Sequence, residues 1–376
     1  MENGLARTPP MGWNSWNQVR CHGLTQDVVL AASEAMADNG MREAGYSYIV
    51  VDDCYQGGRD AASGRLFSHP ERFPDGMGAI GDRIHALGLK FGIYGVPGTR
   101  TCANDWDDYP VTGLGSHGHE RIDAETWAEW GVDYLKYDWC DAHVNAGAVK
   151  IPAFTRMRDE LARAGRDIVY AISEYGVDSP WLWAGDVANS WRTTQDIAPS
   201  WASVSWIIDC QADLWPHARP GAWNDPDMLQ VGNGEFASDM DANRAHVGMW
   251  AMLAASLMVG TSIPDLDPRL LQILTNPELL AIDQDPLGRQ AQRVARNEDG
   301  TQVWARDLNG GAVAVALYNP TDVPREIGTP IPLVGARGPQ VARSVWARED
   351  VGEVAEDLVA HVPARGADLY VLTPRP

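Results

Sequence analysis

Carboxylates stand at the ends of several short apolar segments of this sequence, where acids can transfer protons, attack an electrophilic carbon or bind a cation. These acids are Asp52 and Asp53 after YIVV, Asp138 after YLKY, Glu174 after IVYAIS, and Asp196, Asp225 and Asp227 in SWRTTQD and AWNDPD. A single acid in such a place is equally well explained as a helix cap or a loop residue. Their repetition at strand ends favours one shared site.

Lys136 and Asp138 are two residues apart in the segment YLKYD. Side chains two apart on a strand point to the same face, so the ammonium and the carboxylate are expected to lie together. A neighbouring cation keeps a carboxylate ionised, which suits a nucleophile. A purely structural ion pair is the alternative.

The set of acids, together with many tryptophans, favours glycoside hydrolysis. This reaction needs one carboxylic acid to protonate the leaving oxygen and one carboxylate as nucleophile or base. The chain has 16 Trp against 11 Tyr and 5 Phe, and tryptophan offers flat apolar surfaces on which sugar rings stack. A divalent-metal hydrolase is the weaker alternative because histidines are absent from the expected strand ends. We therefore expect no metal and no cofactor.

Short β-type segments alternate with amphipathic helical stretches from about residue 10 to 285. The expected strands are Tyr48–Val51, Lys90–Tyr94, Tyr134–Tyr137 and Ile168–Ile172, with weaker ones at Met11–Trp13, Ser190–Arg192, Gly221–Trp223 and Leu257–Val259. One expected helix starts at the cap Thr25 and stops at Gly40. Eight such strand and helix units predict a (β/α)8 TIM barrel, in which all strand ends converge on one mouth. An open doubly wound sheet is the alternative, but no GxGxxG follows a strand.

The pattern changes after Gly288. The expected strands are Gln302–Arg306, Ala312–Tyr318, Ser344–Ala347 and Leu369–Leu372, with a turn at Asn309–Gly311. We predict a catalytic barrel over 1–288 and a small C-terminal antiparallel β-sandwich domain over 289–376.

Composition excludes several classes of partner. The formal charge of −21 argues against nucleic acid and anionic membranes as partners, and no apolar run is long enough to span a bilayer. The N-terminus lacks the pattern of a signal peptide, so the sequence as written predicts a cytoplasmic protein, or a secreted one if a leader has been removed. Both a monomer and a homo-oligomer are compatible with the sequence.

Several blocks resemble glycoside hydrolase family 27, the α-galactosidase family. They are PPMGWNSWN, YIVVDDC, KFGIYG, GHERIDAETWAEWGVDYLKYDWC, SEYG, WRTTQDI, WNDPDML and ILTNPELLAIDQDPLG, in the family's order over most of the chain. The resemblance implies a retaining hydrolase that releases terminal α-linked galactose from oligosaccharides or glycosides. Asp138 would be the nucleophile and Asp196 the acid/base.

The resemblance also implies sugar-binding residues. Asp52 and Asp53 would bind the 4- and 6-hydroxyls, Lys136 the 3- and 4-hydroxyls, and Glu174 and Arg192 the 2-hydroxyl. The pocket would be lined by Trp16 as a platform, Tyr94, Asp227 and Met228. Glu174 argues against an N-acetylgalactosamine specialist, because its side chain would fill the space for the acetamido group.

Departures from the family pattern leave the sugar open. Asn104–Leu114 resembles an insertion at the pocket rim, and Thr261–Ser262 replaces a polar pair that is usual near the eighth strand. The alternative activities within the family are hydrolysis of α-1,6-glucans, as by isomaltodextranase, and of β-L-arabinopyranosides. A non-catalytic carbohydrate-binding barrel is the rival from another class.

The family's cysteine pattern is matched in part. By resemblance, Cys21 would pair with Cys54 and Cys102 with Cys140, which leaves Cys210 without a partner in this scheme. Five reduced thiols are the alternative, and a cytoplasmic location would favour them.

Overall fold

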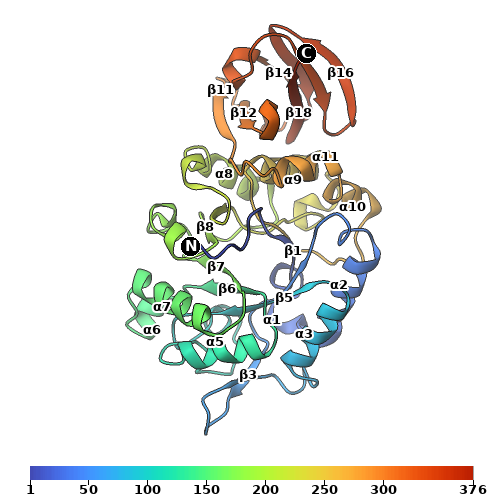
Figure 1. Ribbon diagram of the computed structural model, residues 1–376. Helices are drawn as coiled ribbons and strands as arrows, with labels where there is room; N and C mark the ends of the chain where they lie inside the picture. The colour runs from blue at the N-terminus through green and yellow to red at the C-terminus, as the bar shows by residue number, and fades with distance from the viewer. Residues whose placement is uncertain (376) are drawn as a thin grey trace. The chain divides into compact units, whose positions relative to one another are not determined.

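Strands and helices alternate up to residue 283, and strands dominate thereafter (Figure 1). The structure is a computed structural model that describes residues 1–375. Eight strands form one sheet in the order β10-β1-β2-β5-β6-β7-β8-β9, and the pairs from β1 to β8 are parallel. Their bounds are β1 Met11–Asn14, β2 Tyr48–Val51, β5 Lys90–Gly95, β6 Tyr134–Asp138, β7 Val169–Ser173, β8 Ser190–Arg192, β9 Trp223–Asp225 and β10 Leu257–Val259. The predicted (β/α)8 barrel is confirmed.

The connections between these strands carry the helices. They are α1 Trp16–Gly23, α2 Gln26–Asp38, α3 Met77–Ala86, α4 Cys102–Trp106, α5 Glu120–Glu129, α6 Ala142–Asn145, α7 Lys150–Arg163, α8 Trp201–Cys210, α9 Met240–Met252, α10 Pro268–Leu274 and α11 Pro277–Asp283, with a hairpin of β3 Gln56–Arg59 and β4 Leu66–Ser68. Thr25 caps α2 as predicted, its side chain accepting from the Val28 N–H at 3.4 Å. Gly40 follows the helix with φ +92°, a conformation that glycine adopts without strain.

Strand β6 shows how the barrel positions the side chains of candidate catalytic residues. Leu135 and Tyr137 are fully buried, and the Tyr137 ring meets Phe154 of α7 edge-on at 6.1 Å. Because side chains alternate along a strand, this packing sends Lys136 and Asp138 to the opposite face. The register sets Lys136 beside Tyr94 of β5 and Asp138 beside Ser173 of β7.

The ninth strand begins later than predicted. We expected Gly221–Trp223, but β9 covers Trp223–Asp225. Arg219 and Ala222 exchange backbone hydrogen bonds of 2.8 Å in each direction, and Gly221 between them has φ +83°. The residues predicted to start the strand therefore close a tight turn.

The C-terminal strands form two antiparallel sheets over a common apolar core, which confirms the predicted β-sandwich. The first sheet has the order β11-β12-β13-β18-β15-β16 and the second pairs β14 with β17. The strands are β11 Gln292–Arg296, β12 Gln302–Asp307, β13 Val313–Asn319, β14 Arg325–Pro330, β15 Gln340–Ser344, β16 Glu349–Val354, β17 Asp357–Val362 and β18 Gly366–Pro374. Their buried residues include Val315 from β13, Ile327 from β14 and Leu358 from β17.

The strand predicted at Ser344–Ala347 is wrong. Strand β15 ends at Ser344, and a turn follows in which the Arg348 N–H donates to the Ser344 carbonyl at 2.8 Å. The Ser344 hydroxyl also accepts from the Ala347 N–H at 3.2 Å. These local hydrogen bonds compete with the ladder and reverse the chain.

Contacts divide the chain into two compact units. The first contains Met1–Ala6, Pro10–Gln195 and Met258–Asp265, and the second contains Arg7–Pro9, Asp196–Leu257 and the chain from Leu266 onward. The predicted domain boundary between residues 288 and 289 stays a prediction. Every helix within residues 1–375 is too short or too polar to cross a bilayer.

Candidate active site

Lys136 joins two of the predicted acids, Asp52 directly after β2 and Asp138 at the end of β6, with β5 between these two strands in the sheet. Its Nζ lies 2.8 Å from Asp52 Oδ2 and 3.8 Å from Asp138 Oδ2. The same ammonium lies 5.4 Å from the centre of the Tyr94 ring. The ammonium thus lies within ion-pair distance of both carboxylates. The structure therefore brings Asp52, Tyr94, Lys136 and Asp138 together.

Asp52 is held by a network that fixes its orientation. Its Oδ2 also accepts from Asn14 Nδ2 at 2.7 Å, its Oδ1 accepts from the Asp53 N–H at 2.9 Å, and its own N–H donates to Ser15 Oγ at 3.0 Å. Asn14 is the last residue of β1 and was missed by the sequence reasoning. Its position at a strand end, as for the acids, is the signal that could have found it.

Asp53 is held by two backbone N–H groups and also by the Thr101 side chain. Its Oδ1 accepts from the Cys54 N–H at 2.7 Å and its Oδ2 from the Ala103 N–H at 2.9 Å. Burial raises the pKa of Asp53 to about 7, with the neighbouring Asp52 charge adding to the rise and the two backbone N–H groups opposing it. The carboxylate thus ties β2 to the first turn of α4, and its predicted contact with a sugar hydroxyl stays a prediction.

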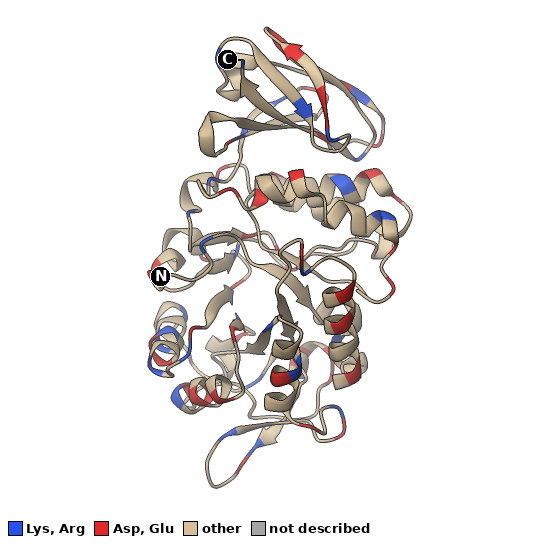
Figure 2. Ribbon diagram, turned by 45° about the vertical axis from the view of Figure 1, so that its right-hand side comes forward, with Lys and Arg blue, Asp and Glu red and all other residues tan. Residues whose placement is uncertain are grey.

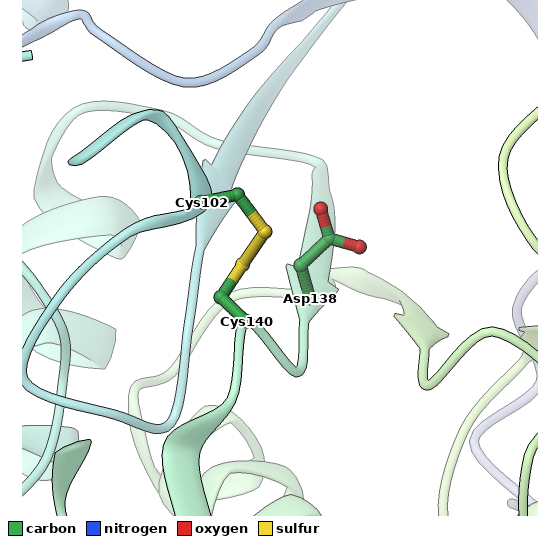
Figure 3. A group of neighbouring side chains, drawn as sticks. All are labelled: Cys102, Asp138 and Cys140. Atoms are coloured by element: carbon green, nitrogen blue, oxygen red, sulfur yellow. A yellow bond between two sulfur atoms is a disulfide. The ribbon is translucent and has the colours of Figure 1, made fainter. Parts of the chain in front are cut away.

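Two disulfides lie beside these acids and confirm the predicted cysteine pairs. Cys21 pairs with Cys54, which follows Asp53, and Cys102 pairs with Cys140, two residues after Asp138. Figure 3 shows the Asp138 carboxylate next to the Cys102–Cys140 bridge. The fifth cysteine, Cys210, is free and exposed.

Trp16 sits at the start of α1, beside the same network. Its backbone N–H donates to Asn14 Oδ1 at 2.8 Å, and the Arg20 guanidinium lies 5.1 Å from its ring centre. Arg20 is in turn held by two hydrogen bonds of 3.0 Å to Asp107. One cation thus borders the indole, and stacking of a sugar on the ring stays a prediction.

Glu174 is engaged by a lysine that the sequence reasoning missed. Its Oε2 lies 2.6 Å from Lys150 Nζ, which is also 2.6 Å from Asp178 Oδ2. The Glu174 side chain is 0% exposed, and burial raises its pKa while Lys150 opposes the rise. Direct contact with a 2-hydroxyl would therefore require this carboxylate to become accessible. Arg192 is buried, and its Nη2 donates to the Thr194 carbonyl at 3.1 Å.

The predicted acid/base lies in the second unit, in a segment held by Asp227. Asp196 is exposed, and the N–H of the next residue, Ile197, donates to Asp227 Oδ2 at 2.8 Å. Asp227 Oδ1 accepts from the Met228 N–H at 2.7 Å, and its carbonyl accepts from the Trp250 indole at 2.7 Å. Both Asp227 oxygens thus bind backbone, so Asp227 can orient the segment that carries Asp196.

Comparisons with known proteins identify the family. A family model described as alpha galactosidase A matches residues 8–285, and one described as the alpha galactosidase C-terminal beta sandwich domain matches residues 298–372. The chain belongs to the α-galactosidase family, glycoside hydrolase family 27. This family 27 chain is 40% identical over 380 residues to alpha-galactosidase 3 of Arabidopsis thaliana. The alignment covers 100% of this chain and 84% of the relative. It is accordingly a glycoside hydrolase.

Several solved structures share the fold over nearly the whole chain. Alpha-galactosidase I from Mortierella vinacea has a TM-score of 0.92 and 32% identity, covering 99% of this chain and 98% of its own. An α-galactosidase from Saccharomyces cerevisiae, solved with raffinose, has a TM-score of 0.88 and 28% identity over 99% of each chain. A β-L-arabinopyranosidase from Geobacillus stearothermophilus has a TM-score of 0.86 and 26% identity, covering 98% and 97%. Likeness in fold alone therefore does not distinguish galactose from arabinose as the sugar.

Proposed function

We propose that this family 27 enzyme is a retaining, exo-acting α-galactosidase that works without a cofactor. Asp138 attacks the anomeric carbon of a terminal galactose and forms a covalent glycosyl-enzyme. Asp196 protonates the leaving oxygen and then removes a proton from the water that hydrolyses the intermediate. A retaining reaction requires the two carboxyl groups to be roughly 5–5.5 Å apart.

The observation that carries this proposal is the position of Lys136 between Asp52 and Asp138. One cation there can hold the nucleophile and a second carboxylate beside the same sugar. Lys136 and Asp52 are both well shielded from solvent, with 16% and 2% of their side chains exposed, so their charges act with little screening. Relatives named as α-galactosidases, such as that of Arabidopsis thaliana, support galactose as the sugar.

The proposed recognition of galactose uses the remaining predicted residues. Asp52, Asp53 and Lys136 would bind hydroxyls on one side of the ring. Arg192 would bind the 2-hydroxyl together with Glu174, whose carboxylate would have to become accessible first. Trp16, Tyr94, Asp227 and Met228 would enclose the sugar. The two disulfides favour an oxidising compartment for the working enzyme, because thiols are kept reduced in the cytosol.

A panel of aryl glycosides tests the substrate. We expect the largest kcat/KM on the α-galactoside when it is measured beside the α-glucoside, the α-N-acetylgalactosaminide and the β-L-arabinopyranoside. Higher kcat/KM on any of the other three would overturn galactose as the sugar. Release of glucose oligomers from dextran at a higher rate than galactose from raffinose would assign the enzyme to α-1,6-glucans instead.

A further inference from the structure

The Cys102–Cys140 disulfide and Asp138 form a compact group of potential metal ligands. The two Sγ atoms and a carboxylate oxygen all lie within 4.8 Å of one another (Figure 3). Cys140 is buried and Cys102 is partly buried. Within residues 1–375, no other set of three His, Cys, Asp or Glu side chains is gathered in this way. The group is unusual because it contains the proposed nucleophile.

The backbone explains why the three side chains meet. Asp138 ends β6, and the chain then turns sharply, with φ +41° at Cys140 and φ +51° at Asp141. Cys102 begins α4, whose first turn is held by the Asp53 carboxylate through the Ala103 N–H. The two Cα atoms are 4.9 Å apart. Cys102 is thus held through Ala103 by the acid that follows β2, and Cys140 is held in the turn after β6, where its carbonyl accepts from Asn145 Nδ2 at 2.9 Å.

Two tyrosines complete the surroundings of the sulfur atoms. The Tyr94 hydroxyl lies 3.1 Å from Cys140 Sγ, and the Tyr175 hydroxyl lies 3.2 Å from Cys102 Sγ. A disulfide carries no hydrogen, so the hydroxyls are the donors. These contacts give the sulfur atoms a polar environment in which charged thiolates would be stabilised.

We propose that reduction of the Cys102–Cys140 disulfide turns this group into a site for a thiophilic divalent cation such as Zn²⁺, bound by two thiolates and the Asp138 carboxylate. The bound cation would occupy the carboxylate that the proposed function uses as nucleophile, and hydrolysis would stop. The inhibition, though not the binding, rests on the proposed function.

The chemistry balances with a phosphine as reductant. The phosphine donates two electrons to the S–S bond and takes the oxygen of one water, and the two protons of that water complete two thiols. Zn²⁺ then displaces both thiol protons and forms two Zn–S bonds of about 2.3 Å and one Zn–O bond of about 2.0–2.2 Å. Ligand atoms within 4.8 Å of one another need only small shifts to reach such a geometry, and water can fill the fourth position.

Cadmium binding tests the site without relying on activity. The full chain carrying Cys210→Ser is reduced with the phosphine, freed of excess reductant under argon and titrated with Cd²⁺. We expect one equivalent to give the ultraviolet charge-transfer band of cadmium thiolate. The band should persist in a Cys21→Ser/Cys54→Ser variant and disappear in a Cys102→Ser/Cys140→Ser variant. An equal band in the latter variant, or none in the parent, would overturn the proposal.

Two further measurements cover the carboxylate and the fold of the variants. Asp138→Asn should weaken cadmium binding at least tenfold, and unchanged affinity would remove Asp138 from the ligand set. In the reduced parent protein, Cd²⁺ should protect Cys102 and Cys140 from alkylation, as read by peptide mass spectrometry. Alkylation of both at the unprotected rate would contradict the site even if a serine variant failed to fold.

Activity then tests the consequence. Zn²⁺ should abolish hydrolysis of an aryl α-galactoside by the reduced enzyme, chelation should restore it, and the oxidised enzyme should be unaffected. If the protein binds cadmium but never hydrolyses the galactoside in any state, the proposed function fails and the metal site stands. If the reduced enzyme is active and Zn²⁺ leaves it so, the inhibitory role is wrong.

Discussion

At the scale of single residues, the site depends on carboxylates that do different work in different surroundings. Asp138 lies 3.8 Å from the Lys136 ammonium, whereas Asp53 is bound by backbone N–H groups and has a pKa raised by burial to about 7. Each carboxylate oxygen of Asp227 likewise accepts a hydrogen bond from a backbone N–H group. The sequence can therefore predict that an acid lies at the site. Whether that acid serves catalysis or holds the backbone depends on its hydrogen-bond and ion-pair partners, which only the structure shows.

Replacing Asp138 by Ala should lower kcat on an aryl α-galactoside by a factor of about 10³ or more, because the covalent intermediate cannot form. The circular dichroism spectrum should stay native. Added azide should restore turnover with the configuration at the anomeric carbon inverted. Retained activity without azide would refute Asp138 as nucleophile.

Replacing Asp227 by Asn should affect substrates unequally. An amide offers only one acceptor oxygen, so one of the two backbone N–H groups loses its partner, at a cost of about 1–3 kcal/mol. If the lost contact frees the Asp196 segment, kcat should fall more for raffinose, whose leaving group needs a proton, than for a nitrophenyl galactoside.

Asp239→Asn is the matched control, because Asp239 caps α9 by accepting from the Ala242 N–H at 3.0 Å, and asparagine caps equally well. It should leave both rates unchanged. An equal loss on both substrates in Asp227→Asn would mean that Asp227 does not act through the acid/base.

At the scale of elements, most of the fold was predictable because the barrel strands are short and apolar and are bounded by polar or turn-forming residues. Strands β2, β8 and β10 have the predicted bounds. The predicted bounds of β9 and the predicted strand at Ser344–Ala347 are wrong for the same reason. Hydrogen bonds within a turn take the place of the strand-to-strand hydrogen bonds that the residue types favour. The engagement of Glu174 by Lys150 was also beyond prediction, because it joins α7 to the end of β7 across a distance that sequence patterns do not fix.

Gly12 of β1 tests how tightly the strands pack. A Cβ there would lie 2.2 Å from the Tyr48 carbonyl oxygen of β2, so Gly12→Ala should cost several kcal/mol or prevent folding. Gly78 lies in α3, and in Gly78→Ala the new Cβ would lie 3.7 Å from Trp130 at the end of α5, an ordinary van der Waals contact. This control should be as stable as the parent or up to about 1 kcal/mol more stable. Equal urea midpoints for the two variants would contradict the register of β1 and β2.

At the scale of the whole molecule, the charge of −21 divides into a few functional acids and a solvated surface. Figure 2 shows Asp and Glu side by side with Lys and Arg on the helices. A second group of acids is neither catalytic nor exposed. Asp283 is fully buried, and burial raises its pKa to about 8, with the Arg306 charge opposing the rise. Such groups make stability depend on pH.

Stability should fall as the pH rises from 6.5 to 8. Asp283 and Asp53 have folded pKa values of about 8 and about 7, above the ordinary 3.8, so the folded chain holds protons that the unfolded chain has lost. The stabilisation is complete below the ordinary pKa and is lost as the pH rises through the folded values. Asp283→Asn cannot ionise and should show a smaller fall in Tm over this interval.

Below pH 6.5 a buried histidine acts in the opposite direction. Burial lowers the pKa of His246 to about 3. Between this value and the ordinary pKa, His246 is protonated in the unfolded chain but not in the folded one, so stability is lost as the pH falls. Thermal scans at pH 6.5, 7.25 and 8 keep this effect small, and the comparison with Asp283→Asn cancels it because both proteins contain His246. Parallel Tm curves for the parent and Asp283→Asn would rule out Asp283 as a source of the pH dependence.

The stereochemistry of the first product tests the central claim most directly. Hydrolysis of an aryl α-galactoside followed by proton NMR from the first seconds should show α-galactose appearing before mutarotation produces the β-anomer. This order follows from two displacements at one carbon through a glycosyl-Asp138 intermediate. Appearance of β-galactose first would mean a single displacement by water and would contradict the account.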